Sequence, residues 1–330
     1  MLLALVAYAV LAGADFGGGV WDIAARGARR DAQRRAVARA LGPVWEANHV
    51  WLIFAVVLLF GCFPRAFAAL SIALFAPLHL ALVGITLRGV AFVFRAYGPQ
   101  EARALRVYGA VFGGASVVTP VLLGQCLGAV AGGRLRLAGL TVPEGSRGAW
   151  LAPFSWLVGA FALASCAYLA AVYLTLETTG PLREDFRRRA LASGTVLVAL
   201  SVVAPWLTRR EAPLLGHALL SPRSLPVLCL GGAVALLSGL GLWRRWYRLA
   251  RASSIAWVAL LLAGLGLAMY PSLIVPDLDL HDAAAPAVTL RGVLWTIPPG
   301  LALLLPSLGF LFKVFKSNLE VIHEGSNGHL

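Results

Sequence analysis

The chain has 330 residues, of which 59% are hydrophobic and only 13% are charged, and its mean hydropathy is +0.80. Soluble domains carry about 25% charged residues, so this composition excludes a soluble globular protein and indicates an integral membrane protein. The net charge of +13 comes from arginine-rich connections between apolar segments, which fits orientation in a bilayer and argues against nucleic-acid binding.

Nine apolar segments approach the roughly 20 residues that a helix needs to cross a bilayer. They predict an all-α integral membrane protein with about nine transmembrane helices in a single membrane domain, 1–330. We expect two four-helix bundles, within 1–130 and 151–270, and a peripheral last helix at 293–315, although periodicity alone does not show this grouping. The segments are 2–25, 43–62, 66–87, 107–130, 151–176, 190–207, 226–243, 253–270 and 293–312.

Basic residues alternate between rich and poor connections along all nine segments. The rich connections, which include 26–39 and 183–189, hold 20 of the 28 lysines and arginines, and the poor ones hold the other eight. Basic loops stay in the cytoplasm, so we expect the N-terminus outside and the C-terminus inside. No lysine or arginine precedes Arg26, which argues against a signal peptide with a basic n-region.

Asp15 lies in the middle of the first predicted helix, in the stretch GADFGGGVWD. Gly18, Gly19 and Asp22 follow it by three, four and seven residues and therefore share its face. The glycines allow another helix to approach closely, and Asp22 is expected to pair with the arginines of 26–30. A carboxylate at the depth of Asp15 predicts a functional group facing the bundle or water. The alternative is a protonated, hydrogen-bonded packing residue.

The second predicted helix opens with the polar stretch WEANHVW. Glu46 and His49 share a face, and Trp45 and Asn48 lie on the adjacent stripe. Because a basic loop precedes this helix, Glu46 lies about one turn into the membrane, where a desolvated carboxyl group can hold or pass a proton near neutral pH. The alternative is an interfacial anchor, with Trp45 and Trp51 in an aromatic belt and Glu46 paired with an arginine.

Candidate ligands for a cofactor or metal are few. His49 and His79 are the histidines within the predicted spans, and either could ligate haem, but a lone helical histidine is more often hydrogen-bonded structure. The four cysteines are scattered without metal-site spacing. The external stretch 274–282, IVPDLDLHD, could bind a cation weakly, although a solvated loop is the simpler interpretation. Arg88 and Arg95 are expected to anchor the third helix or contact anionic lipid.

Three motifs in order resemble subunit II of the cytochrome bd quinol oxidases. They are GADFGGG at 13–19, GPVWEANHVWLI at 42–53 and LRGVAFVFR at 87–95. The corresponding family motifs read close to GFDFGVG, GPVWDGNEVWL and RGVAFEFR. The match covers about the first hundred residues, and the remainder resembles the family in helix layout and in weaker stretches such as AMYPSLIVP at 268–276.

The resemblance implies a heterodimer with a subunit I that carries two haems b, one haem d and the quinol site, and a small accessory subunit is possible. It implies an electrogenic quinol oxidase of the bacterial cytoplasmic membrane that reduces oxygen to water with protons from the cytoplasm. Subunit II would serve as scaffold and supply part of the proton path. In that path Glu46 matches the motif acid, commonly Asp, and Asp15 matches the acid of the first motif, while Trp45, Asn48 and Trp51 match their motif positions.

The sequence departs from the family pattern at several positions. Ala47 stands where Gly is usual, His49 where Gln or Glu is common, and Val93 where the third motif has an acid. These departures predict a divergent member of the family. The resemblance implies that catalysis takes place mainly in the partner, and we assign no ligand for a cofactor or metal to this chain. A proton-coupled secondary transporter with buried acids and broken helices, or a purely structural membrane subunit, remain alternative functions.

Overall fold

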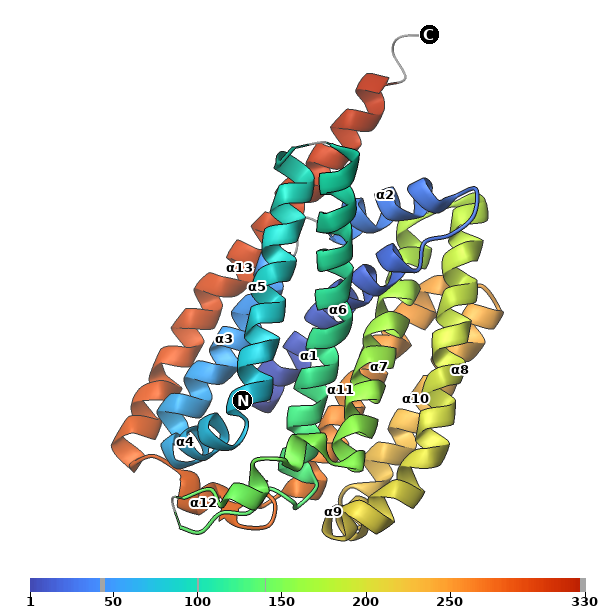
Figure 1. The fold of residues 1–330 in the computed structure, drawn as a ribbon. Coiled ribbons are helices and arrows are strands. Elements are labelled where there is room, and N and C mark those ends of the chain that lie inside the picture. Colours follow the sequence, from blue (N-terminus) through green and yellow to red (C-terminus); the bar gives the residue numbers. More distant parts are fainter. Residues whose placement is uncertain (42–44, 100, 140, 327–330) are drawn as a thin grey trace.

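The computed structural model describes residues 1–41, 45–99, 101–139 and 141–326, without the side chains of 41, 45–47, 96 and 311–326. Long helices lie side by side, and most of the short helices lie toward one end (Figure 1). The two strands form one antiparallel sheet. The long helices are α1 Leu2–Ile23, α3 Trp45–Cys62, α5 Phe75–Tyr97, α6 Ala102–Ala131, α7 Pro153–Glu177, α8 Gly180–Glu211, α10 Leu225–Trp243, α11 Tyr247–Met269 and α13 Ala287–Ser326. The short elements are α2 Arg30–Leu41, α4 Pro64–Ala73, η1 Glu144–Ser146, η2 Ala149–Leu151, α9 Pro213–Leu219, β1 Ser272–Ile274, β2 Leu278–Asp279 and α12 Leu280–Ala283.

The helices confirm the predicted class, a multi-pass all-α membrane protein. Within the described ranges, eight helices are long and apolar enough to cross a membrane: α1, α5, α6, α7, α8, α10, α11 and α13. Helices α3 and α4 together supply a ninth if they are counted as one span, although they are bent by 117° at the break between them. The expected count of about nine therefore holds.

The predicted third span, 66–87, is wrong in its boundaries. That segment is divided between α4, which ends at Ala73, and α5, which begins at Phe75 and continues to Tyr97. Pro77 explains the break, because a proline inside a continuous helix would clash with the carbonyl group of Ala73 four residues before it. Hydropathy averaged over the whole segment does not detect this break.

The basic connection at 26–39 contains the helix α2, which the hydropathy pattern did not predict. Ala36 and Val37 of α2 are buried against Leu174 and Phe186, while most of its arginines face outward. Such a helix has too little apolar length to register as a span, but its one apolar stripe is enough to fix it against α7 and α8.

Close helix contacts surround α1. A Cβ atom added at Gly17 would lie 1.9 Å from the backbone oxygen of Cys166 in α7, and one at Gly19 would lie 2.1 Å from the Oγ atom of Ser116 in α6. The expectation that glycines of this motif admit another helix therefore holds for Gly19. Gly18 is buried in the same helix. The closest approach of α1 to the backbone of a neighbouring helix is at Gly17, a glycine that was not among those predicted to face another helix.

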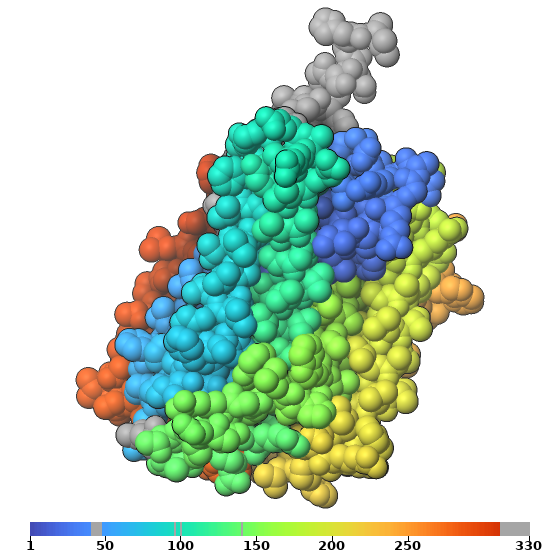
Figure 2. Space-filling model, in the orientation of Figure 1, coloured from blue at the N-terminus to red at the C-terminus, as the bar shows by residue number. Residues whose placement is uncertain are grey.

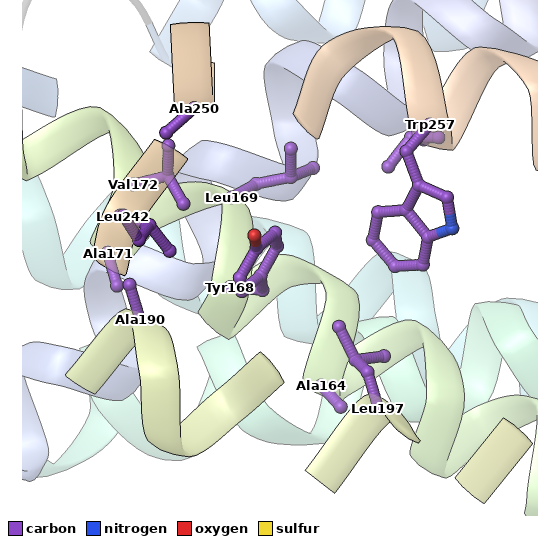
Figure 3. Close-up of a cluster of buried hydrophobic side chains, with 11 residues drawn as sticks. Ala164, Tyr168, Leu169, Ala171, Val172, Ala190, Leu197, Leu242, Ala250 and Trp257 are labelled. Atoms are coloured by element: carbon purple, nitrogen blue, oxygen red, sulfur yellow. The ribbon is translucent and has the colours of Figure 1, made fainter. Parts of the chain in front are cut away.

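A large apolar cluster joins α7, α8, α10 and α11 (Figure 3). Tyr168 lies at its centre, with its ring edge-to-face against Trp257 at 5.9 Å between centroids. Its hydroxyl oxygen lies 2.7 Å from the Oγ atom of Ser238, so the polar end of the ring is satisfied inside the cluster. By contrast, no residue in the membrane-spanning part of α13 is buried, and α13 packs against α3. The division into two four-helix bundles stays a prediction.

The stretch 274–282 is more ordered than the solvated loop that we expected. Arg136 donates to both carboxylate oxygens of Asp277, at 2.8 and 3.0 Å, and the Leu137 N–H donates to Oδ2 at 2.7 Å. The hydrogen bonds from Arg136 hold the pKa of the Asp277 carboxyl group below its usual range. Among the described residues, no group of three or more His, Cys, Asp or Glu side chains is placed to hold a metal ion.

Candidate functional site

Asp15 and Arg88 form an ion pair in the interior, between α1 and α5. Their side chains are 2% and 3% exposed. The Nη1 atom of Arg88 donates to Oδ2 of Asp15 at 2.8 Å, and Nη2 donates to Oδ1 at 2.7 Å and to the backbone oxygen at 3.1 Å. Because desolvating two charges costs several kcal/mol for each ion, a buried pair is tolerated only when its geometry is this complete.

The remaining surroundings of Arg88 come from α1 and α6. Its Nε–H donates to the Oγ atom of Ser116 at 3.0 Å, and Ser116 in turn donates to the backbone oxygen of Phe112 at 2.7 Å. The guanidinium carbon lies 5.2 Å from the ring centroid of Phe16 and 4.8 Å from that of Phe112. Two aromatic faces and a hydroxyl group therefore replace the water that the cation loses.

A second ion pair lies two helical turns nearer the end of the molecule that carries α2. Arg95 donates to the two carboxylate oxygens of Asp22 at 2.9 and 3.0 Å, and its side chain is 26% exposed. Asp22 therefore pairs with Arg95 and not with the 26–30 cluster, which corrects our expectation. Arg88 and Arg95 were expected to anchor the third helix or contact anionic lipid, but both instead bind acids of α1. Matching seven-residue spacings on α1 and α5 make these pairings possible.

Tyr8, Asp15 and Asp22 repeat every seven residues along α1 and so share one face. We call these three residues, with Arg88 and Arg95, the polar column. The Tyr8 hydroxyl group is buried and has no hydrogen-bond partner among the described residues. The column therefore extends from the partly exposed guanidinium group of Arg95 at one end to the buried hydroxyl group of Tyr8 inside the bundle.

The predicted residues of the second motif lie beside this column where they are described. The ring of His49 packs edge-on against Tyr8, with centroids 6.3 Å apart. Asn48 is 2% exposed, and both its Oδ1 atom and the Trp51 Nε1 atom are buried without a partner among the described residues. The side chains of Trp45 and Glu46 lie outside the described part of the structure, so no contact of Glu46 enters the description of this site.

Both histidines of the predicted spans contact aromatic residues of this chain. His79 lies on the outer surface of α5, with Nδ1 2.7 Å from the backbone oxygen of Phe75 and its ring 3.9 Å from the Phe75 ring. His49 packs against Tyr8, and Met269, the methionine within the predicted spans, lies in a separate cluster around Ala268.

Several residues of this site were missed or misread in the sequence. Arg88 and Arg95 were noticed, but their position near the end of a span suggested an interfacial role. Their seven-residue spacing, equal to that of Asp15 and Asp22 on α1, is the signal that could have identified both pairs. Tyr8 continues the seven-residue repeat of Asp15 and Asp22, and this spacing could have identified it. Ser116 carries no such signal, because single hydroxyl groups are common in membrane helices.

Sequence comparisons identify a family for this chain and several relatives. A family model described as cytochrome bd terminal oxidase subunit II matches residues 1–315. Cytochrome bd-I ubiquinol oxidase subunit 2 of Escherichia coli K12 is 30% identical over 204 residues, which cover 59% of this chain and 51% of that protein. Cytochrome bd ubiquinol oxidase subunit 2 of Bacillus subtilis is 28% identical over 201 residues, covering 60% and 58%. The chain thus matches little more than half the length of these relatives.

Two further similarities extend over nearly the whole chain. A putative cytochrome bd menaquinol oxidase subunit II of Bacillus subtilis is 23% identical over 330 residues, covering 96% of this chain and 94% of that protein. A chain in the structure of bd oxidase from Geobacillus thermodenitrificans has the same fold, with a TM-score of 0.79, 24% identity, and coverage of 95% and 96%. Because the family model spans almost the entire sequence, this chain belongs to the cytochrome bd terminal oxidase subunit II family.

Proposed function

We propose that this chain is subunit II of a quinol oxidase of the bacterial cytoplasmic membrane that reduces oxygen to water. It serves as scaffold for a haem-bearing subunit I in a heterodimer, which a small accessory subunit can complete. Haems b and d are held by the partner, and quinol is the electron donor. The observation that carries this proposal is the family match over residues 1–315.

The chain also contributes to the cytoplasmic proton-uptake path, with Glu46 as its entry acid. Glu46 precedes Asn48 and Trp51 on α3, whose buried polar atoms, like the Tyr8 hydroxyl group, lack partners among the described residues. Buried polar groups nearly always bind either protein or ordered water, so these atoms favour internal water between α1 and α3. Asp15 takes part as a fixed charge, because Arg88 holds both of its carboxylate oxygens.

Purification of the tagged chain from its native host tests the oxidase assignment. We expect a haem protein of similar size to co-purify in equal amount, with b- and d-type bands in the reduced-minus-oxidised spectrum. The same chain expressed alone should give a flat spectrum. Recovery of the chain from its host without a haem protein would contradict the proposal and favour a transporter. A stoichiometric haem band from the isolated chain, lost in His49→Ala or His79→Ala, would make it an electron carrier.

We further propose that the N-terminus lies outside and the C-terminus in the cytoplasm, because connections rich and poor in basic residues alternate along the chain.

A cysteine-labelling experiment tests this orientation. Single cysteines at Ala38 in α2 and at Ala138 in the loop after α6 replace exposed alanines near opposite ends of the molecule. A membrane-impermeant maleimide added to intact cells, after outer-membrane permeabilisation where one is present, should label Ala138→Cys but label Ala38→Cys only after lysis. The unsubstituted chain is the control, since Cys62, Cys126 and Cys166 are buried and Cys229 is exposed within a span. Labelling of both positions from one side would refute this orientation.

A further inference from the structure

The turn between α10 and α11 has the sequence WRRWYR, residues 243–248, which we call the α10–α11 tip. The Trp246 N–H donates to the Gly241 oxygen at 2.7 Å, and the Arg245 N–H donates to the Leu242 oxygen at 3.3 Å, a Schellman arrangement. This arrangement places Arg245 at φ 62°, and Arg245 is the non-glycine residue with positive φ in the described ranges. Glycine normally occupies such a position. A residue with a side chain, such as this arginine, adopts the left-handed conformation at a free-energy cost of about 1 kcal/mol.

The side chains of the tip project from the body of the protein (Figure 2, orange at the right edge). Trp243 is 66% exposed and Trp246 is 53% exposed. The guanidinium carbon of Arg244 lies 5.5 Å from the Trp243 ring centroid and 5.9 Å from that of Trp246. Tryptophan is enriched where a span meets the membrane surface, and α10 and α11 are both candidate spans that end here. The two rings therefore place Arg244 at headgroup level.

The charge of the tip is not balanced by acids. Glu184 of α8 is already bound by Arg187, whose Nη2 atom donates to it at 2.7 Å, and Arg245 lies 3.7 Å from the same carboxylate. Arg244 and Arg248 are exposed and form no ion pair with any acid that the structure describes. Two unpaired cations thus lie on either side of Trp246, in the region where lipid phosphate groups are found.

The geometry points to a binding site for an anionic phospholipid at the α10–α11 tip. Arg244 and Arg248 bind the headgroup phosphate, and Trp243 and Trp246 lie against the adjoining glycerol and upper acyl region. Arg88 and Arg95, which the sequence suggested for lipid contacts, are already bound to Asp15 and Asp22. The tip combines free charge with interfacial aromatic rings, which is the chemistry of such a site.

The test uses the membrane protein as purified, with the partner that it carries, after delipidation in detergent. Dioleoyl-phosphatidylglycerol, dioleoyl-phosphatidylcholine or inorganic phosphate is titrated, and bound lipid is counted by native mass spectrometry. We expect Arg244→Gln/Arg248→Gln to raise the dissociation constant for phosphatidylglycerol roughly 30-fold, which corresponds to about 1 kcal/mol for each arginine near an anionic surface. Arg244→Lys/Arg248→Lys keeps the charge and should restore most of the binding.

The matched control is Arg103→Gln/Arg106→Gln, which removes two exposed arginines from the start of α6 without flanking tryptophans. It should leave this binding almost unchanged. The proposal is overturned if the control and the tip variant lose binding equally, or if phosphatidylcholine binds the tip as tightly as phosphatidylglycerol. Displacement of the lipid by equimolar inorganic phosphate would likewise overturn it, because the site would then recognise phosphate alone. If the glutamine variant does not assemble, a lysine variant that binds no phosphatidylglycerol would contradict the proposal.

Discussion

Substitution of Arg88 by leucine is expected to prevent accumulation of the folded protein. The change leaves the Asp15 carboxylate at 2% exposure without its two charged hydrogen bonds, and it removes the donor to Ser116. Removing one partner of a buried ion pair costs about 3–5 kcal/mol, a large part of the 5–15 kcal/mol that typically stabilises a domain. Fluorescence-detected size-exclusion chromatography of the tagged chain in detergent measures the loss.

Three further variants separate the causes of this loss. The double substitution Arg88→Leu/Asp15→Leu removes both charges and should recover much of the folded protein, because an apolar pair avoids the uncompensated charge. Asp15→Asn keeps Arg88 and should give an intermediate loss. Arg106→Leu, at an exposed position in α6, is the matched control and should behave as wild type. Equal yields from Arg88→Leu and Arg106→Leu would show that the ion pair contributes little.

The sequence predicted the class of fold because the cost of burying a peptide group in lipid allows few alternatives. Apolar length and the distribution of arginines indicate helices that cross the membrane, and nearly every predicted segment contains one. The errors in the predicted helix boundaries occur where one or a few residues matter more than the average hydropathy of a segment. Pro77 separates α4 from α5 inside an apolar run, and the apolar stripe of α2 is hidden among its arginines.

Some residues of the candidate site were noticed in the sequence, but their arrangement was not. Asp15 stood out because a carboxylate in a span is expensive, and Gly19 stood out because it lies on the same face. The equal seven-residue spacings of the two acids and of Arg88 and Arg95 are the one sequence signal for their partners, since any of several arginines otherwise lies within reach of a carboxylate on a long helix. The choice of Arg88 for Asp15 and of Arg95 for Asp22 depends on how α1 and α5 are aligned, which is set by packing over their full length.

Glu46→Gln is expected to lower the oxygen-reduction turnover of the assembled oxidase severely, by roughly 100-fold or more if each turnover must draw a proton through this group. Glutamine keeps the shape and hydrogen-bonding length of glutamate but cannot exchange a proton. Haem content and the yield of the complex should stay near those of the wild type. Oxygen consumption with excess quinol, normalised to haem, gives the measurement.

Two variants decide whether proton transfer or anchoring explains the role of Glu46. Glu46→Asp keeps a titratable carboxyl group, and aspartate is common at this motif position in the family, so most of the turnover should return. Glu101→Gln removes an exposed acid just before α6 and should have little effect on turnover. If Glu46→Gln keeps full turnover, Glu46 is an interfacial anchor and the chain serves as scaffold alone. If turnover falls in Glu46→Gln and returns in Glu46→Asp while the haem spectrum stays constant, the carboxyl group itself is required, because the two variants differ in whether position 46 can carry a proton.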